Sequence, residues 1–174
     1  MQACYPTDMK RIDCKSHCPI NFALETFGDP WSMLILRDIV YFGKKTYSEF
    51  LASEERMATN VLANRLEFLE DKGVLVSQPH PADRRKEVYE LTQKGLDLIP
   101  VLIEMSLWSA TYDEETQAPP EWIETVKTSK ANVTGCMYQT VKEGGCVFVG
   151  DNSVVCKMTR PSAATVTTAL GQSA

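Results

Sequence analysis

The segment from Thr46 to Leu91 constrains the fold more than any other part of the chain. Its pattern predicts a short helix, a tight turn, a second helix and then a β-hairpin. Thr46 and Glu49 have the spacing of a capping box, in which each side chain accepts a hydrogen bond from the other residue's backbone N–H. The second helix, about residues 59 to 72, stops before Gly73. Two short helices joined by a tight turn predict a helix-turn-helix.

The hairpin carries a cluster of cations. Two strand-like runs, VLVSQ and EVYEL, flank a predicted loop PHPADRRK at residues 79 to 86, where prolines suit an exposed position. Arg84, Arg85 and Lys86 stand together there, although the 174-residue chain has a net charge of −5 and a pI near 5.1. Alone, such cations would only keep a hairpin in solution. Next to the helix-turn-helix they predict the wing of a winged helix, with Asp83 placed to pair with one arginine.

The polar side chains of the helix at residues 59 to 72 change in kind along its length. At about 100° per residue, one side holds Leu62, Leu66 and Leu69, and the opposite side holds Asn60, Asn64, Glu67 and Asp71. Thr59 and the amides therefore lie toward the N-terminus, as in a recognition helix that enters the major groove by that end. Asn can read adenine there through two hydrogen bonds, whereas the alternative is ordinary polarity of an exposed face. Arg65 flanks the apolar side, so its head is expected to pair with a carboxylate or a phosphate.

Helices are also predicted on both sides of this segment. One spans about Pro19 to Phe27, and another begins at Asp29-Pro30, runs through WSMLILRDIVYF and closes at Gly43. Thr92 is predicted to cap a helix at about residues 93 to 112, which Pro100 is expected to kink.

The helix at 93 to 112 is apolar on more than one stripe. A helix this apolar must bury most of its circumference, so half of it is expected to meet a second subunit. Leu102, Leu107 and Trp108 are the predicted dimer contacts. For Trp31 and Trp108, core packing is favoured over a ligand cage.

These elements define the domain organisation and the fold class. We expect a mostly α protein with a small β-hairpin wing (α+β): a winged helix-turn-helix over residues 18–112 that dimerises through its terminal helices. A polar arm is predicted at 1–17 and a linker at 113–120. Residues 121–158 are expected to form a C-terminal extension, a helix plus a possible hairpin in GGCVFVGDNSVVCKM, and 159–174 a flexible tail.

Several classes of protein are disfavoured. The longest apolar stretch, LDLIPVLIEMSLW, is too short to span a bilayer and no signal peptide is visible, so we expect a cytoplasmic chain with no membrane partner. Its six cysteines are then expected to be thiols. Neither His17 nor His80 stands in a nucleophile pattern, and no glycine-rich loop could hold phosphates. An enzyme is therefore not expected, and no cofactor is predicted.

The cysteines near the N-terminus allow two further readings. Cys4, Cys14, His17 and Cys18 invite a zinc site, but Cys-x-x-His-Cys is not a common structural zinc spacing, so no metal is predicted. Cys18 directly precedes the helix at Pro19, where free amides favour a thiolate. Redox sensing is one hypothesis for Cys18, and packing as a small apolar residue is the other.

Residues 18 to 112 resemble the HxlR-type helix-turn-helix transcriptional regulators. The shared motifs are a Cys-Pro start, Gly-x-x-Trp-x-x-x-Ile-Leu-Arg, Leu-x-x-Arg-Leu-x-x-Leu-Glu and Tyr-x-Leu-Thr-x-x-Gly. The resemblance implies a dimeric bacterial or archaeal regulator that binds palindromic operators, with Thr59, Asn60 and Asn64 in the recognition helix and Arg84 and Arg85 in the wing. It also matches Cys18 to a cysteine that some members use to sense oxidants or electrophiles.

The chain departs from the family in two places, and two rival functions stay open. Pro30 stands where many relatives have Lys, and residues 120 to 174 extend past the usual family end. The rivals are a winged-helix protein-interaction module, which the acidic pI favours, and a small-ligand sensor whose effector sits between the core and the dimer helices. The sequence names neither an operator nor an effector.

Overall fold

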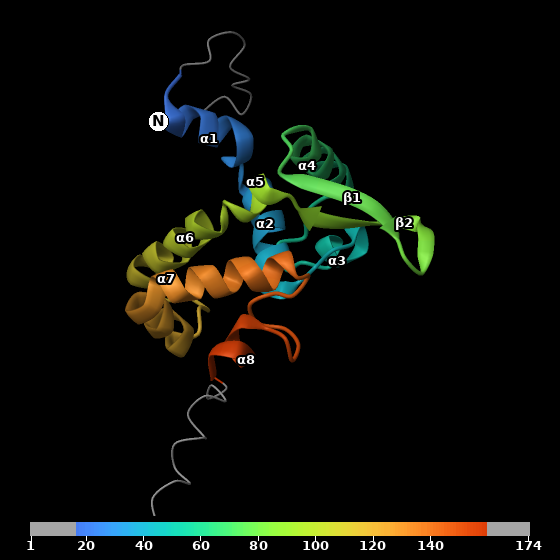
Figure 1. Ribbon diagram of the computed structural model, residues 1–174. Helices are drawn as coiled ribbons and strands as arrows, with labels where there is room; N and C mark the ends of the chain where they lie inside the picture. The colour runs from blue at the N-terminus through green and yellow to red at the C-terminus, as the bar shows by residue number, and fades with distance from the viewer. Residues whose placement is uncertain (1–16, 160–174) are drawn as a thin grey trace, which may run out of the picture.

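The computed structural model describes residues 17 to 159 and is mostly helical, with one β-hairpin (Figure 1). The elements in chain order are α1 (Pro19–Phe27), α2 (Pro30–Phe42), α3 (Tyr47–Leu51), α4 (Thr59–Asp71), β1 (Leu75–His80), β2 (Asp83–Leu91), α5 (Gln93–Leu96), α6 (Ile99–Tyr112), α7 (Pro120–Lys142) and α8 (Val154–Thr159). The predicted fold class, mostly α with a small β-hairpin wing, is confirmed. The arm at 1–17 and the tail at 159–174 lie, except for one residue each, outside the described residues.

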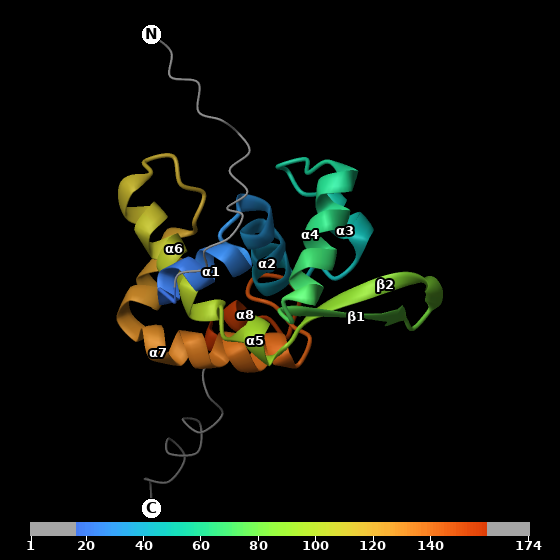
Figure 2. The same ribbon diagram turned by 90° about the horizontal axis from the view of Figure 1, so that it is seen from above.

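Helix α2 lies at the centre of the molecule, between α4 on one side and α6 on the other (Figure 2). Asp29 caps its start by accepting a hydrogen bond from the Ser32 N–H at 3.0 Å. It ends at Gly43, whose φ of 69° is in the left-handed region that glycine adopts without strain. Its fully buried side chains include Ile35 and Leu36, and burying each such side chain contributes roughly 1.5–3 kcal/mol.

The helix-turn-helix forms as predicted. Thr46 and Glu49 make the capping box, with the Thr46 N–H donating to Glu49 Oε2 at 2.8 Å. Helix α4 packs on both α2 and α3. It does so through its predicted apolar side, Leu62, Leu66 and Leu69, which is buried.

The hairpin is longer than expected. β1 and β2 pair antiparallel from Leu75 opposite Leu91 to His80 opposite Asp83, which leaves Pro81 and Ala82 as the turn. The predicted loop at 79–86 is therefore wrong, and its cations stand on strand β2. The sheet has two strands only, so each has an outer edge, where a proline such as Pro79 removes no ladder hydrogen bond.

The helix expected at 93 to 112 is two helices. Thr92 caps α5 by accepting from the Gly95 N–H at 3.3 Å, and α6 starts anew at Ile99. Pro100 sits in the first turn of α6, where its missing N–H has no intrahelical partner to lose. The expected kink at Pro100 is therefore replaced by a helix start.

The C-terminal extension begins with α7, which lies along α6 in both views (Figures 1 and 2). Its buried residues include Trp122, Val126, Val133 and Met137, and its one residue with non-helical backbone angles is Ser129. Part of the apolar surface of α6 is thus covered by its own chain. Leu102, a predicted dimer contact, is only 6% exposed within this single chain, so that assignment is corrected to core packing.

The possible hairpin at residues 144 to 158 is also wrong. Among the described residues this segment is an irregular turn followed by α8. Within the segment, the N–H groups of Val154 and Val155 donate to the Cys146 and Val147 carbonyls at 3.1 and 3.2 Å, without forming strands. The segment also pairs with a helix end: the Val147 N–H donates to the Val40 carbonyl and the Phe148 N–H to the Tyr41 carbonyl, both at 3.0 Å. These are the last carbonyls of α2, which have no partner within their own helix. None of the helices described could cross a membrane, given their length and polarity.

Two glycines offer a matched test of this packing. A Cβ on Gly95 would lie 2.4 Å from the Val74 carbonyl oxygen, whereas one on the exposed Gly135 would meet nothing within 4 Å. We expect Gly95→Ala to lower the free energy of unfolding by about 1–3 kcal/mol. Gly135→Ala should raise it by about 0.5–1 kcal/mol, because alanine loses less backbone entropy in a helix. Urea unfolding followed by circular dichroism measures both, and equal changes would contradict this account of α5.

Candidate nucleic-acid interface

Helix α4 presents its N-terminal end to solvent. Its N-cap is Ala58, which provides no side-chain hydrogen bond, so the amides of the first turn are free to meet an anion. The Tyr47 hydroxyl donates to the Thr59 carbonyl at 2.7 Å and ties the start of α4 to α3. The helix end is therefore both fixed in position and open.

The predicted base-reading side chains lie together on this end of α4. Thr59, Asn60 and Asn64 are exposed, and within the described residues their side chains make no hydrogen bond. Asn60 and Asn64 stand four residues apart and so share one face of the helix. Their amides are available for an outside partner such as a base edge.

Other polar groups of α4 are used inside the protein. Arg65 Nη1 lies 3.3 Å from Asp29 Oδ2, and the guanidinium lies over the Phe68 ring at 5.0 Å. This is the predicted pairing of the Arg65 head with a carboxylate. Glu70 accepts a hydrogen bond from the Ser77 N–H at 2.8 Å and fixes the start of β1. Arg65 is thus less free to reach a phosphate than its sequence position indicates.

The wing separates its cations onto two faces. Arg85 Nε lies 3.1 Å from Asp83 Oδ1, which confirms the predicted pairing, and this hydrogen bond lowers the pKa of Asp83. Side chains alternate along a strand, so Arg84 and Lys86 share the opposite face. Neither makes an ion pair in the part of the chain described, and both are exposed. The charge offered by the wing is mainly that of Arg84 and Lys86.

The root of the wing is anchored to the helix-turn-helix. The Tyr89 N–H donates to the Lys45 carbonyl at 2.7 Å, just before α3. The Tyr89 ring is buried with an edge toward Phe50, at 6.1 Å between ring centroids. Burial raises the pKa of Tyr89, as does its hydroxyl's 2.9 Å hydrogen bond to Glu87. Helix α4 and the hairpin are consequently held in one arrangement, and both project from the same side of the body (Figure 1).

One candidate contact was not predicted from the sequence. Arg56 is exposed in the turn before α4, and its φ of 51° is unusual for a residue other than glycine. It precedes the open end of α4 by three positions, where a phosphate would also be attracted. The sequence could have indicated this contact, because Arg56 is the one cation between α3 and α4.

The remaining predicted residues lie away from this surface. Cys18 is exposed with a free thiol and is the N-cap of α1. Leu107 is half-buried, while Trp108 is 66% exposed and its ring lies tilted against that of Tyr112, at 5.2 Å between centroids. Across residues 17 to 159, no three His, Cys, Asp or Glu side chains gather as a metal site would require, and Cys4 and Cys14 lie outside that range.

Comparison with known proteins decides the family. Residues 26–117 match the model of the HxlR-like helix-turn-helix family. The chain belongs to this family. The relatives described next are transcriptional regulators, not enzymes.

Two bacterial relatives illustrate how much of the chain is shared. An uncharacterized HTH-type transcriptional regulator of Mycobacterium tuberculosis is 31% identical over 98 residues, which are 56% of this chain and 61% of that relative. YodB, an HTH-type transcriptional regulator of Bacillus subtilis, is also 31% identical over 98 residues, 56% of this chain and 87% of YodB. The family match, residues 26–117, ends before α7 and α8 begin.

Two solved structures share the fold. PA1607, a candidate transcription factor, is 35% identical with a TM-score of 0.54. The match covers 60% of this chain and 72% of the PA1607 chain. The redox regulator HypR in its oxidized form is 26% identical with a TM-score of 0.50, and covers 56% of this chain and 99% of its own. This HxlR-like chain is therefore a winged helix-turn-helix of the kind found in bacterial regulators.

Proposed function

We propose that this protein is a sequence-specific DNA-binding transcriptional regulator that acts as a homodimer on a palindromic operator. The observation that carries the proposal is the pairing of an open, amide-bearing end of α4 with the free cations of the wing. Helix α4 would enter the major groove by its N-terminus, and the wing at 79–87 would contact the backbone or the adjacent minor groove. A net charge of −5 does not oppose this, because phosphates respond to local charge.

The proposed contacts have separate tasks. Thr59, Asn60 and Asn64 would face base edges, with Asn able to read adenine through two hydrogen bonds. Arg84, Lys86 and, once released from Asp83, Arg85 would neutralise phosphates. Arg65 remains a candidate only if DNA displaces Asp29 from it, since the two are 3.3 Å apart. Arg56 is the added candidate for a phosphate next to the α4 terminus.

We predict different effects for the two sets of residues. Asn60→Ala or Asn64→Ala should reduce discrimination between preferred and random duplexes by about 1–3 kcal/mol where a bidentate contact is lost. Arg84→Ala should weaken binding to all duplexes and reduce the slope of log affinity against log salt by about 1. Selection from randomised duplexes, followed by fluorescence anisotropy over a salt series, measures both.

Two further variants sharpen this test. Asp83→Ala frees Arg85, so binding should strengthen and the salt slope should steepen. Lys127→Ala removes an exposed cation from α7, outside the helix and wing, and should change neither quantity. If the unaltered protein prefers no duplex at low salt, the DNA-binding proposal fails and a winged-helix protein-interaction module takes its place.

The proposed dimer rests on apolar surface that one chain leaves open. In α1 only Thr26 is buried, and Ile20, Phe22 and Leu24 are exposed. Trp108 and Tyr112 on α6 are exposed as well. An isologous interface built from these terminal helices would cover both sets and place two recognition helices about one turn of DNA apart, roughly 34 Å.

Light scattering tests this dimer. Trp108→Asp should turn a dimer into a folded monomer at micromolar concentration, because Trp108 is exposed in the single chain. Leu102→Asp should instead cause loss of circular dichroism, since it places a charge in the core. Val149→Asp, an exposed apolar position after α7, should leave the dimer intact. A monodisperse monomer of the unaltered protein would contradict the proposal.

Thiol regulation is a second candidate function, favoured by the exposed free thiol of Cys18 at the start of α1. HypR, which shares the fold, is a redox regulator. Oxidation would join Cys18 to a second thiol as a disulfide, with two electrons and two protons passing to the oxidant. A linkage there would displace α1 and, through the proposed dimer, change the spacing of the recognition helices.

Diamide treatment tests this second candidate. DNA affinity of the unaltered protein should fall after treatment and recover with a thiol reductant, while Cys18→Ser should keep its affinity. Cys156→Ser, in the partly buried helix α8, is the matched control and should still respond. Equal loss in the unaltered protein and in Cys18→Ser, or no loss in either, would remove Cys18 from the functional residues and leave it as a packing residue.

A further inference from the structure

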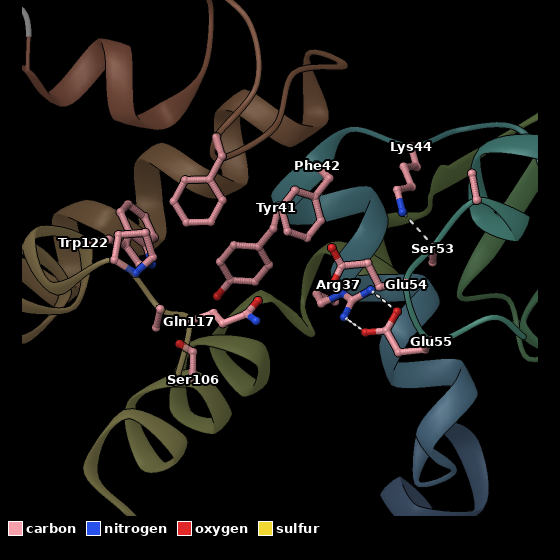
Figure 3. A pocket seen from close by; sticks show the side chains of 14 residues that line it. Arg37, Tyr41, Phe42, Lys44, Ser53, Glu54, Glu55, Ser106, Gln117 and Trp122 are labelled. Carbon is pink, nitrogen blue, oxygen red and sulfur yellow. Dashed lines mark hydrogen bonds and ion pairs between the residues drawn. The ribbon is translucent and has the colours of Figure 1, made fainter. Parts of the chain in front are cut away.

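A cavity of about 910 Å³ lies where the C-terminal extension meets the winged helix (Figure 3). Tyr41 and Phe42 from the end of α2 form one side, and Trp122 from the first turn of α7 forms another. Ser53 and Glu55, from the turn between α3 and α4, complete the wall. The volume is within the range of small-molecule sites, about 300–1,000 Å³.

Aromatic rings line this cavity. Phe148 packs against Tyr41 in a stacked arrangement, at 5.7 Å between centroids, and meets Trp122 edge-on at 5.5 Å. Phe42 lies 6.2 Å from Phe148 and is partly exposed. Phe148 is held in place by its backbone hydrogen bond to Tyr41. Planar apolar surfaces of this kind suit an aromatic ligand.

Two polar atoms in these walls have no partner. Tyr41 Oη and Trp122 Nε1 are buried without a hydrogen bond to any described residue. Tyr41 is only 7% exposed and Trp122 only 6%. Figure 3 shows the Tyr41 hydroxyl pointing toward Ser106 and Gln117. Ser106 donates its own hydroxyl to the Ile103 carbonyl at 2.8 Å, and although it lies near Tyr41 the two hydroxyls do not have the geometry of a hydrogen bond. Unpaired buried donors are rare in native proteins.

The tyrosine is a neutral donor. Burial raises the pKa of Tyr41, and the nearby Ser106 hydroxyl only partly opposes the rise. At neutral pH the cavity therefore offers an O–H from Tyr41 and an N–H from Trp122. Both groups can donate a hydrogen bond to a ligand, and the indole N–H cannot accept one.

The charged residues around the cavity neutralise one another. Arg37 pairs with Asp38 and with Glu55, and Lys44 Nζ lies 3.0 Å from Asp38 Oδ2 and 2.7 Å from Ser53 Oγ. The hydrogen bond from Arg37 lowers the pKa of Glu55, which stays anionic. Glu54, the remaining charged residue of the wall, is the exception, since it is exposed and makes no ion pair among the described residues. This solvated carboxylate opposes an anionic ligand, and the aromatic walls favour a neutral ligand.

We propose that this cavity binds a neutral, planar aromatic molecule that carries a hydrogen-bond acceptor such as a carbonyl oxygen. The rings of Tyr41, Trp122 and Phe148 would enclose the aromatic part, and the Tyr41 hydroxyl and Trp122 indole N–H would donate to the acceptor. The site depends on α7 and Phe148, which belong to the C-terminal extension. That extension would thus give this chain a ligand site of its own.

The position of the cavity also suggests regulation. Its wall includes the turn that joins α3 to the recognition helix, which Arg37 and Lys44 hold through Glu55 and Ser53. A ligand beside these pairs that bound one arrangement of the turn more tightly than another would shift the population between them. This regulatory step rests on the proposed DNA-binding function, whereas ligand binding itself does not.

Four naphthalene probes test the site in the full-length chain by isothermal titration calorimetry. 1-Acetonaphthone, which is neutral and has a carbonyl, should bind. Naphthalene, which lacks the acceptor, should bind about tenfold more weakly, the value of one to two hydrogen bonds. 1-Naphthoate and 1-naphthylmethylammonium should bind more weakly than the ketone. No binding of 1-acetonaphthone, or equal binding of ketone and naphthalene, would overturn the proposal.

Variants assign the binding to the two donors. Tyr41→Phe and Trp122→Phe keep an aromatic wall, and each should weaken 1-acetonaphthone binding by about three- to tenfold while sparing naphthalene. Tyr41→Phe should not lower the thermal midpoint of the unliganded protein, because the hydroxyl it removes has no partner. Tyr138→Phe, which removes a hydroxyl of α7 that donates to Gln93 outside the cavity, is the control and should bind both probes unchanged. Unchanged binding of the ketone in both cavity variants would refute the assignment.

The regulatory step has its own readout. Saturating 1-acetonaphthone should change the affinity of the unaltered protein for its selected duplex, and the change should shrink in Tyr41→Phe. Ligand binding without any effect on duplex affinity would overturn the proposed regulation but not the proposed ligand site. A protein that binds 1-acetonaphthone but no duplex would instead overturn the proposed DNA-binding function.

Discussion

The arrangement of the helix-turn-helix depends on the contacts of one buried carboxylate, that of Asp38. It lies near the end of α2, is 2% exposed, and is contacted by Arg37, Lys44 and Ser53. A buried charge is costly unless it is paired and hydrogen-bonded, so these partners cannot move away independently. Ser53 belongs to the turn before α4. The carboxylate therefore fixes the turn, and with it the recognition helix, to the central helix.

The same end of α2 also holds the C-terminal extension. Its last carbonyls would otherwise lack partners, and the N–H groups of Val147 and Phe148 satisfy two of them. Helix α7 then covers one side of α6. The extension is thus built into the core of the winged helix, and the cavity lies at the junction between these two parts. A signal received there would reach the helix-turn-helix through few intervening residues.

The surface offered to DNA is set by which charges the fold uses for itself. Arg65 pairs with Asp29, Arg85 with Asp83, and Glu70 with the backbone of β1. Among the described residues, the polar groups left open on the helix and wing include Asn60, Asn64, Arg84 and Lys86. An acidic chain can therefore present a small cationic wing next to uncharged amides. Local pairing, not the net charge, decides what a duplex would meet.

Local chemistry determined much of this protein from sequence alone. The Thr46–Glu49 capping box, the Asp29 cap, Gly43 and the apolar side of α4 each act within a single helix or its ends, so the helix-turn-helix and its exposed residues could be predicted. Only the tertiary structure decided the rest. Leu102 is buried by α7, and Val147 and Phe148 pair with α2 instead of forming a hairpin. These outcomes, like the cavity between Tyr41 and Trp122, depend on contacts between residues far apart in the chain, which no local pattern encodes.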